Sequence, residues 1–387
     1  MINYHQLSQE MHRLAEFNTE VSELGVIFAR INKLFASFIR SPHQYYNILE
    51  NTPPNKKLYA KVLQQEQKEL LWPESCDISY QISAIDGSQA GPYHVITWPK
   101  HFQLLNIASI TVEYGPQQSY NHHSYAVFTN TDESKQIFPS EVDLATLRSY
   151  YEFREAHQLT KSICKSPSLL LIDGSLLWWS LDNKPEQVKK NCLVLLNQFF
   201  QDAQSRQIVP LGYISGTQSS DLANCLRVIY CKQATGGDVN NQVCASCNDE
   251  LCTILSGLRD EFLFEMLASD QHKSSIISPL FQSQVEDKSA YEKIPIYFFY
   301  LYLDGECVRV ELPAFCHSQM SLILTCLSDQ LQKGHGYPVL LSDAHELAVV
   351  SVQDKKQIEL MISSYLFSIG LKMLERKKDI SKGMKYV

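Results

Sequence analysis

Ser168-Leu169-Leu170-Leu171-Ile172-Asp173-Gly174-Ser175 is the stretch from which the fold prediction starts. Its apolar run predicts a short buried strand, and Gly-Ser directly after Asp173 predicts the turn that ends it. A second copy of the pattern lies upstream, in Ile82-Ser83-Ala84-Ile85-Asp86-Gly87-Ser88. Because sites in sheet proteins gather where strands end, the two copies predict that neighbouring strands bring two carboxylates together. An alternative stays open, in which each aspartate hydrogen-bonds only its own turn.

Helices and strands alternate around this stretch. An amphipathic pattern predicts a helix over 141–165, and a second helix over 186–205 is followed by a strand over 208–215. Such alternation requires crossover connections, which place strands parallel in one sheet. The predicted fold class is therefore α/β.

The sequence before residue 141 is typical of antiparallel strands. Three strand-like runs, 80–85, 95–98 and 107–114, are separated by short turns and predict a meander. Residues 117–135 are polar, which predicts a loop. Joined to the parallel strands, the meander would make the sheet mixed.

Further helices and one hairpin are predicted after residue 215. The hairpin pairs 296–302 with 307–312 around Asp304-Gly305. Helices are predicted over 249–268, 318–333 and 355–376, and a short segment over 338–341.

The N-terminal part differs from the rest of the chain. Apolar residues recur at three- and four-residue spacing between residues 5 and 72, which predicts helices. Pro42 and Thr52-Pro53-Pro54 interrupt this pattern, and many charges accompany its last part. We interpret residues 1–75 as a helical extension that packs on the main domain or on a partner, and residues 76–387 as the main domain.

Composition excludes several classes of protein. The chain has 387 residues, 44% hydrophobic and 20% charged, which is typical of a globular protein. A net charge of −8 argues against a basic nucleic-acid coat protein but not against a nucleic-acid enzyme, because bound metal ions can neutralise phosphate locally. No signal peptide or membrane-length apolar run is recognised, and eleven cysteines indicate a reducing compartment, so a cytoplasmic location is expected. Phosphate-loop and dinucleotide-binding motifs are absent from the sequence.

Cysteines crowd into an insertion near residues 225–252. Cys244 and Cys247 have the spacing of a chelating pair, and Cys231 and Cys252 flank them. The four thiolates could close a structural Zn²⁺ or iron–sulfur site. The flanking spacing matches no standard zinc pattern, so ordinary buried thiols remain the alternative.

Acidic side chains and one histidine form the candidate site. Carboxylates with an imidazole suit Mg²⁺ or Mn²⁺, and a cluster of this kind is what metal-assisted phosphodiester cleavage needs. Glu152 and Glu155 are close to one helical turn apart and share a face of the predicted helix. The alternative for each is a side chain that lies in water and binds no metal. The candidates are Asp86, Glu152, Glu155, Asp173, Asp343 and His345.

The motifs, in their order along the chain, resemble the NurA nuclease domain over residues 78–365. They are Ala84-Ile85-Asp86-Gly87-Ser88, Leu147-Arg148-Ser149-Tyr150-Tyr151-Glu152, Leu170-Leu171-Ile172-Asp173-Gly174-Ser175-Leu176, Gly212-Tyr213-Ile214-Ser215-Gly216-Thr217, Phe298-Phe299-Tyr300, Arg309-Val310-Glu311-Leu312-Pro313, Gly336-Tyr337-Pro338 and Ala344-His345-Glu346.

The resemblance implies a ribonuclease H-like mixed sheet flanked by helices. It also implies a Mn²⁺-dependent 5′-to-3′ DNA nuclease that works as a homodimer with a hexameric HerA-type ATPase in DNA end resection. Carried over by motif, the metal-binding and catalytic set is Asp86, Glu152, Asp173 and His345. Glu155 and Asp343 are further candidate metal ligands.

Two other functions remain open at this point. A catalytically silent DNA-binding or scaffold subunit could keep the same fold, and a nuclease of this fold could act on RNA. Arg148, Arg227 and Arg309 could each touch a nucleic-acid phosphate, with a structural salt bridge as the alternative for each.

Overall fold

The computed structural model describes residues 21–51, 60–73, 76, 78–93, 102–116, 118–129, 143–163, 167–181, 183–235, 249–284 and 294–371. The chain divides into two compact units. The first takes in residues 1–71, 215–286 and 297–310, and the second takes in 72–214, 287–296 and 311–387. All the carboxylates of the candidate site and His345 belong to the second unit.

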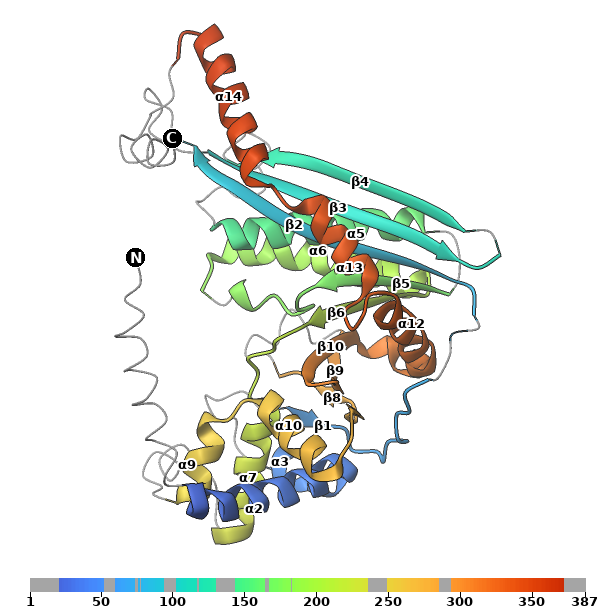
Figure 1. The fold of residues 1–387 in the computed structure, drawn as a ribbon, viewed down its shortest axis with the longest axis vertical. Coiled ribbons are helices and arrows are strands. Elements are labelled where there is room, and N and C mark those ends of the chain that lie inside the picture. Colours follow the sequence, from blue (N-terminus) through green and yellow to red (C-terminus); the bar gives the residue numbers. More distant parts are fainter. Residues whose placement is uncertain are drawn as a thin grey trace. The chain divides into compact units, whose positions relative to one another are not determined.

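The second unit is built on a mixed sheet, as the sequence predicts (Figure 1). Its strands lie in the order β6-β5-β2-β3-β4, where β2 pairs antiparallel with β3, and β3 with β4. β5 pairs parallel with both β2 and β6. The strands are β2 (Tyr80–Tyr93), β3 (Phe102–Tyr114), β4 (Ser119–Phe128), β5 (Ser168–Asp173) and β6 (Ile208–Ile214).

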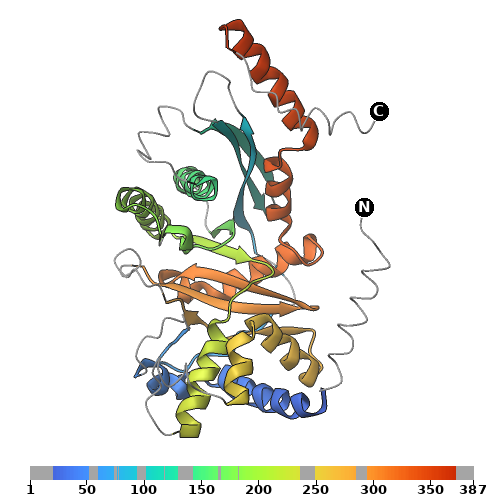
Figure 2. The ribbon, with the colours of Figure 1, turned by 90° about the vertical axis from the view of Figure 1, so that its left-hand side faces the viewer.

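Helices cover both faces of these strands. Figure 2 shows α5 (Leu144–Ser162) and α6 (Glu186–Ser205) on one face and α13 (Val339–Ala348) on the other. α5 and α6 are the crossovers into β5 and β6, because each runs between two consecutive parallel strands. Two more helices of this unit are α12 (Met320–Lys333) and α14 (Val352–Ser368), and two short 3₁₀ helices are η3 (Trp179–Leu181) and η4 (Ala314–Gln319).

Burial explains why the short strand prediction holds for β5. Leu169, Leu170 and Leu171 are fully buried, since helices cover both faces of the sheet. Asp173 is the last residue of the strand, as predicted, and Gly174 follows with a φ of +129°, which favours glycine.

Two predictions in this unit are wrong. The first Asp-Gly-Ser copy does not end a strand, because β2 continues through it to Tyr93 and pairs with β3 from Tyr80 to Ala90. The polar stretch after residue 117 is not a loop but contains β4, an edge strand whose side chains can stay in water. The segment over 338–341, for which the sequence predicts neither helix nor strand, begins α13, with Pro338 at its N-cap. The predicted strand over 95–98 lies outside the described residues.

The first unit packs helices around short strands. Its helices are α2 (Val21–Arg40), η2 (Pro42–Tyr45), α3 (Tyr46–Glu50), α7 (Asp221–Thr235), α9 (Glu250–Gly257) and α10 (Asp260–Gln271). Its strands are β1 (Lys61–Val62), β7 (Ser275–Ile277), β8 (Phe281–Gln282) and most of β9 (Ile296–Leu303) and β10 (Glu306–Pro313). Residues 296 and 311–313 of the last two strands belong to the second unit. The predicted hairpin is confirmed, because β9 and β10 are neighbours joined at Asp304 and Gly305, both with positive φ.

The N-terminal helical prediction holds only in part. α2 buries Ile31, Phe35 and Phe38, and the last two rings contact Phe264 and Phe281. The described residues after 60 form β1 and irregular structure, because backbone pairing with β8 replaces a helix there. The compact unit that contains residues 1–71 also draws on later segments. None of the described helices has both the length and the apolar character that a membrane span requires.

Candidate active site

Asp86 and His345 meet between β2 and α13. The Nδ1 atom of His345 lies 2.8 Å from Oδ2 of Asp86, which forms a hydrogen bond. The side chain of Asp86 is only 12% exposed, whereas that of His345 is 61% exposed. A residue from the middle of the sheet thus holds an imidazole at the surface.

Glu152 reaches β2 from its other face. A Cβ atom added to Gly87 would lie 2.6 Å from Oε1 of Glu152 and 2.9 Å from Cδ1 of Ile107. The carboxylate therefore occupies the space that any larger residue at position 87 would fill. Arg148, four residues earlier on α5, places its Nε 3.4 Å from the same Oε1 atom.

The electrostatics place Glu152 in one cluster with both aspartates. Burial, opposed by the charge of Arg148 and assisted by the negative charges of Asp86 and Asp173, raises the pKa of Glu152 to about 8. Glu152 therefore carries a proton at neutral pH in the metal-free protein.

Glu155 has different partners. Its Oε1 accepts a hydrogen bond from Oγ of Ser109 at 2.7 Å and lies 3.7 Å from Nδ1 of His123. Ser109 and His123 are paired positions on β3 and β4. The two candidate glutamates therefore have different surroundings. Glu152 lies against Gly87 of β2, whereas Glu155 contacts Ser109 of β3 and His123 of β4.

Asp173 lies level with Asp86 at the end of β5, because Ile172 pairs with Ile85. Desolvation raises the pKa of Asp173 and the charge of Asp86 raises it further, while His345, Tyr337 and Arg148 lower it. Tyr337 acts through a hydrogen bond to the carboxyl. Parallel pairing of neighbouring strands therefore brings the two aspartates together.

Tyr337 is a site residue that the sequence did not single out. It stands between α12 and α13, hydrogen-bonds Asp173 and packs edge-on against Tyr213 at 5.4 Å between ring centroids. Its only signal in the sequence was its place in Gly336-Tyr337-Pro338.

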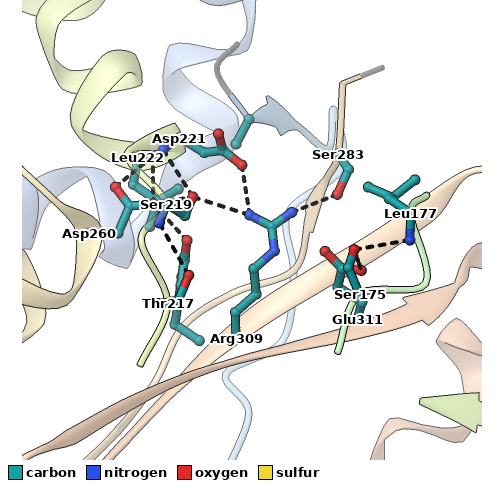
Figure 3. Close-up of polar contacts among 12 residues, drawn as sticks. Ser175, Leu177, Thr217, Ser219, Asp221, Leu222, Asp260, Ser283, Arg309 and Glu311 are labelled. Atoms are coloured by element: carbon teal, nitrogen blue, oxygen red, sulfur yellow. Dashed lines mark hydrogen bonds and ion pairs between the residues drawn. The ribbon is translucent and has the colours of Figure 1, made fainter. Parts of the chain in front are cut away.

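Glu311 is a second residue that sequence reasoning missed. This carboxylate of β10 is fully buried and accepts hydrogen bonds from Oγ of Ser175 at 2.7 Å and from the backbone N–H of Leu176 at 2.9 Å. The Ser175 hydroxyl also accepts from the backbone of Leu177, as Figure 3 shows. Two hydrogen bonds to Glu311 thus hold the turn that directly follows Asp173.

Asp343 stands apart from this cluster. Burial and the charge of Glu346 raise its pKa. Among the described residues, no hydrogen bond or ion pair joins it to Asp86, Glu152 or Asp173.

A family model for the NurA domain matches residues 80–350, which is well over half of the chain and includes every residue of the cluster. The chain belongs to the NurA family. No curated protein matches it.

Solved structures of NurA are similar at low identity. A crystal structure of NurA bound to dAMP and manganese is 12% identical, with a TM-score of 0.34, and the alignment covers 91% of this chain and 94% of that one. A crystal structure of NurA is 13% identical, with a TM-score of 0.33, over 86% of this chain and 96% of that one. A third, of NurA with manganese, is 13% identical, with a TM-score of 0.31, over 82% and 92%.

The side chains of this NurA cluster, Asp86, Glu152, Asp173 and His345, are of the kinds that bind divalent cations. They do not lie close enough together to surround an ion. Carboxylate oxygens and an imidazole suit Mn²⁺ or Mg²⁺, and the negative charge of Asp86 raises the pKa of both Glu152 and Asp173, so a cation would relieve this repulsion. Within the described part of the chain, no group of three or more His, Cys, Asp or Glu side chains lies close enough to hold a metal ion.

The cysteine and arginine candidates lie mostly in the first unit. Sγ of Cys231 lies 3.5 Å from Sγ of Cys252, and Nε of Arg227 lies 3.1 Å from the latter. Cys244 and Cys247 lie outside the described residues. Arg309 is buried, ion-paired with Asp221 at 2.7 Å (Figure 3), so it makes the structural salt bridge rather than presenting its charge to a phosphate.

Proposed function

We propose that this chain is a metal-dependent deoxyribonuclease. The observation that supports it most strongly is that Asp86 holds His345 by a hydrogen bond and acts through its charge on Glu152 and Asp173, in a chain of the NurA family. Similar NurA chains have been crystallised with manganese and dAMP.

Each residue of the cluster has a role that its surroundings support. Asp86, Glu152 and Asp173 would hold Mn²⁺ or Mg²⁺, which activates water and stabilises the leaving oxygen of a phosphodiester. Asp86 holds Nδ1 of His345, which leaves Nε2 as the ring nitrogen for ligation or proton transfer. Glu152 would release its proton on binding a cation, because a ligand must be deprotonated.

The finer features implied by the family are part of the same proposal. The strand order and the α5 and α6 crossovers support a ribonuclease H-like core. A homodimer, a HerA-type hexameric ATPase partner and 5′-to-3′ action in end resection rest on family membership. An ATPase partner also agrees with the absence of a phosphate-loop motif from the sequence. A cytoplasmic location stays a prediction.

The test is DNA cleavage by the full chain with Mn²⁺, on single-stranded and double-stranded ends, with RNA in parallel. Asp173→Asn should lower cleavage to background while the circular dichroism spectrum stays unchanged. Asp343→Asn, on α13 beside Glu346, serves as the control and should keep wild-type activity. Wild-type activity in Asp173→Asn would defeat the assignment. DNA binding without cleavage by the wild type would instead indicate a silent subunit.

The structural metal remains a separate proposal. Cys231 and Cys252 lie close enough to share an ion, and Cys244 and Cys247 would complete four ligands. Elemental analysis of the purified chain should then find zinc or iron, and Cys231→Ser should lose it. A metal-free wild type purified without chelators would support ordinary thiols instead.

A further inference from the structure

Two side chains of the sheet hold the C-terminal end of α13. Nδ2 of Asn106 donates to the carbonyl oxygens of Ala348 at 2.9 Å and Leu347 at 3.3 Å. Oγ of Ser88 donates to the same oxygen of Ala348. Carbonyls in the last turn of a helix lack intrahelical partners, so these donors satisfy groups that would otherwise lose hydrogen bonds on burial. We call Ser88 and Asn106 the α13 clamp.

The register of the sheet places the clamp beside Asp86. Ser88 and Asn106 are paired positions on β2 and β3, and Asp86 lies two residues before Ser88. Side chains two residues apart on a strand share a face, so Asp86 and both clamp residues face α13. His345 precedes Ala348 by three residues, close to one helical turn. The hydrogen bonds of the clamp therefore hold the helical turn from which the imidazole of His345 reaches Asp86.

The ring of His345 has little else to hold it. Its side chain is 61% exposed, and its Nδ1 atom forms a hydrogen bond with Asp86. The rest of α13 is anchored by Leu340, Leu341 and Ala344, which are fully or almost fully buried. Loss of the clamp should therefore release the last helical turn without unfolding the helix.

We propose that Asn106 and Ser88 are positioning residues that fix His345 against Asp86. The inference rests on the proposed nuclease function for its effect on rate. Neither side chain touches a reacting atom. They act through the end of α13, so their removal should matter only while His345 is present.

A double-mutant cycle tests this dependence. With saturating Mn²⁺ and DNA, Asn106→Ala should lower kcat by about 10- to 100-fold, the usual range for residues that orient a metal ligand. In a His345→Ala background the same change should have almost no further effect. Asn191→Ala, on α6 away from the clamp, should leave kcat unchanged. Independent, multiplicative effects of Asn106→Ala and His345→Ala would overturn the proposal.

A second readout does not depend on activity. In the full chain with ¹⁵N-labelled histidine, the Nδ1 resonance of His345 should move at fixed pH in Asn106→Ala and in Ser88→Ala, but not in Asn191→Ala. If the wild type cuts no DNA, the nuclease proposal fails while this shift still reports on the clamp. An unmoved resonance in Ser88→Ala and Asn106→Ala overturns the clamp, whatever the activity. Ser88→Ala removes a single hydroxyl and serves if Asn106→Ala does not fold.

Discussion

Glu152 carries a proton in the folded metal-free protein because its carboxylate would otherwise be desolvated beside two aspartates. Its pKa rises from an ordinary value of 4.5 to about 8. Between these values the folded state binds more protons than the unfolded state, so the free energy of unfolding falls as the pH rises. The full destabilisation is reached above pH 8, where Glu152 is charged.

Glu152→Gln should therefore separate stability from activity. The amide cannot ionise, so the variant should melt a few degrees above the wild type at pH 8.5 without metal, and the difference should shrink toward pH 4.5. Cleavage should fall to background, because a ligand is lost. Thermal melts across this pH range check the prediction, and a variant less stable than wild type at pH 8.5 would contradict it.

Glu155→Gln is the matched control on the same helix. Glu155 accepts a hydrogen bond from Ser109 in the core, away from Asp86. We expect reduced stability with DNA cleavage retained. The opposite result, with Glu155 required and Glu152 dispensable, would show that the other glutamate is the ligand.

Gly87→Ala tests the close approach of Glu152. The new methyl group would lie 2.6 Å from the carboxylate and 2.9 Å from Ile107, so both must move. We expect cleavage to fall about 100-fold, as for a displaced catalytic group. Gly25→Ala, on α2 with no atom near the added methyl, should leave cleavage unchanged and increase stability by up to about 1 kcal/mol. Unchanged cleavage by Gly87→Ala would remove Glu152 from the cluster.

At the scale of secondary-structure elements, local pattern predicted β5, α6 and the β9–β10 hairpin well. These elements have strong local signals: an apolar run, helical periodicity and an Asp-Gly turn. The first Asp-Gly-Ser copy was misread because the same three residues suit a turn and a paired strand, and only pairing with β3 decides between them. Likewise β4 was missed because an edge strand with exposed side chains has no apolar pattern.

An arginine of β10 joins that strand to α7 in the first unit. Arg309 donates to Asp221 and Ser283 (Figure 3). Its Cζ atom lies 3.7 Å from the ring centroid of Phe298. Arg309→Met should lower the free energy of unfolding by about 3–5 kcal/mol, because it leaves Asp221 without its buried partner. Arg206→Met, at the exposed end of α6, should change it by less than about 0.5 kcal/mol. Chemical denaturation measures both, and equal midpoints would contradict the prediction.

At the scale of the whole molecule, cation binding should stabilise the fold. Mn²⁺ at 100 times its dissociation constant adds about 2.7 kcal/mol to the free energy of unfolding. At one fixed Mn²⁺ concentration the gain should be larger at pH 8.5 than at pH 6.5, because Glu152 must lose its proton to bind and the dissociation constant is therefore lower at the higher pH. Asp173→Asn should abolish it. Equal Mn²⁺-induced shifts in that variant and the wild type would place the ion elsewhere.

The whole-molecule arrangement was the least predictable from sequence. The class of fold and the candidate residues followed from patterns and family resemblance, but the contacts that position them did not. Tyr337 and Glu311 lie 164 and 136 residues from Asp173 and Ser175, and no local pattern reports such distant pairs. The contact that distinguishes Glu152 from Glu155, its close approach to Gly87 of β2, likewise has no signal in the local sequence.

The two faces of β2 have a consequence for how this chain can vary. Asp86 and Ser88 form hydrogen bonds with α13 on one face of the strand. Gly87 between them has no side chain, which leaves room on the other face for Glu152 of α5. A deletion of one codon between Tyr80 and Asp86 would shift the strand by one residue. Asp86, Gly87 and Ser88 would then each point to the opposite face of the sheet. Homologous genes should therefore hold the length of this strand constant even where its amino acids have drifted.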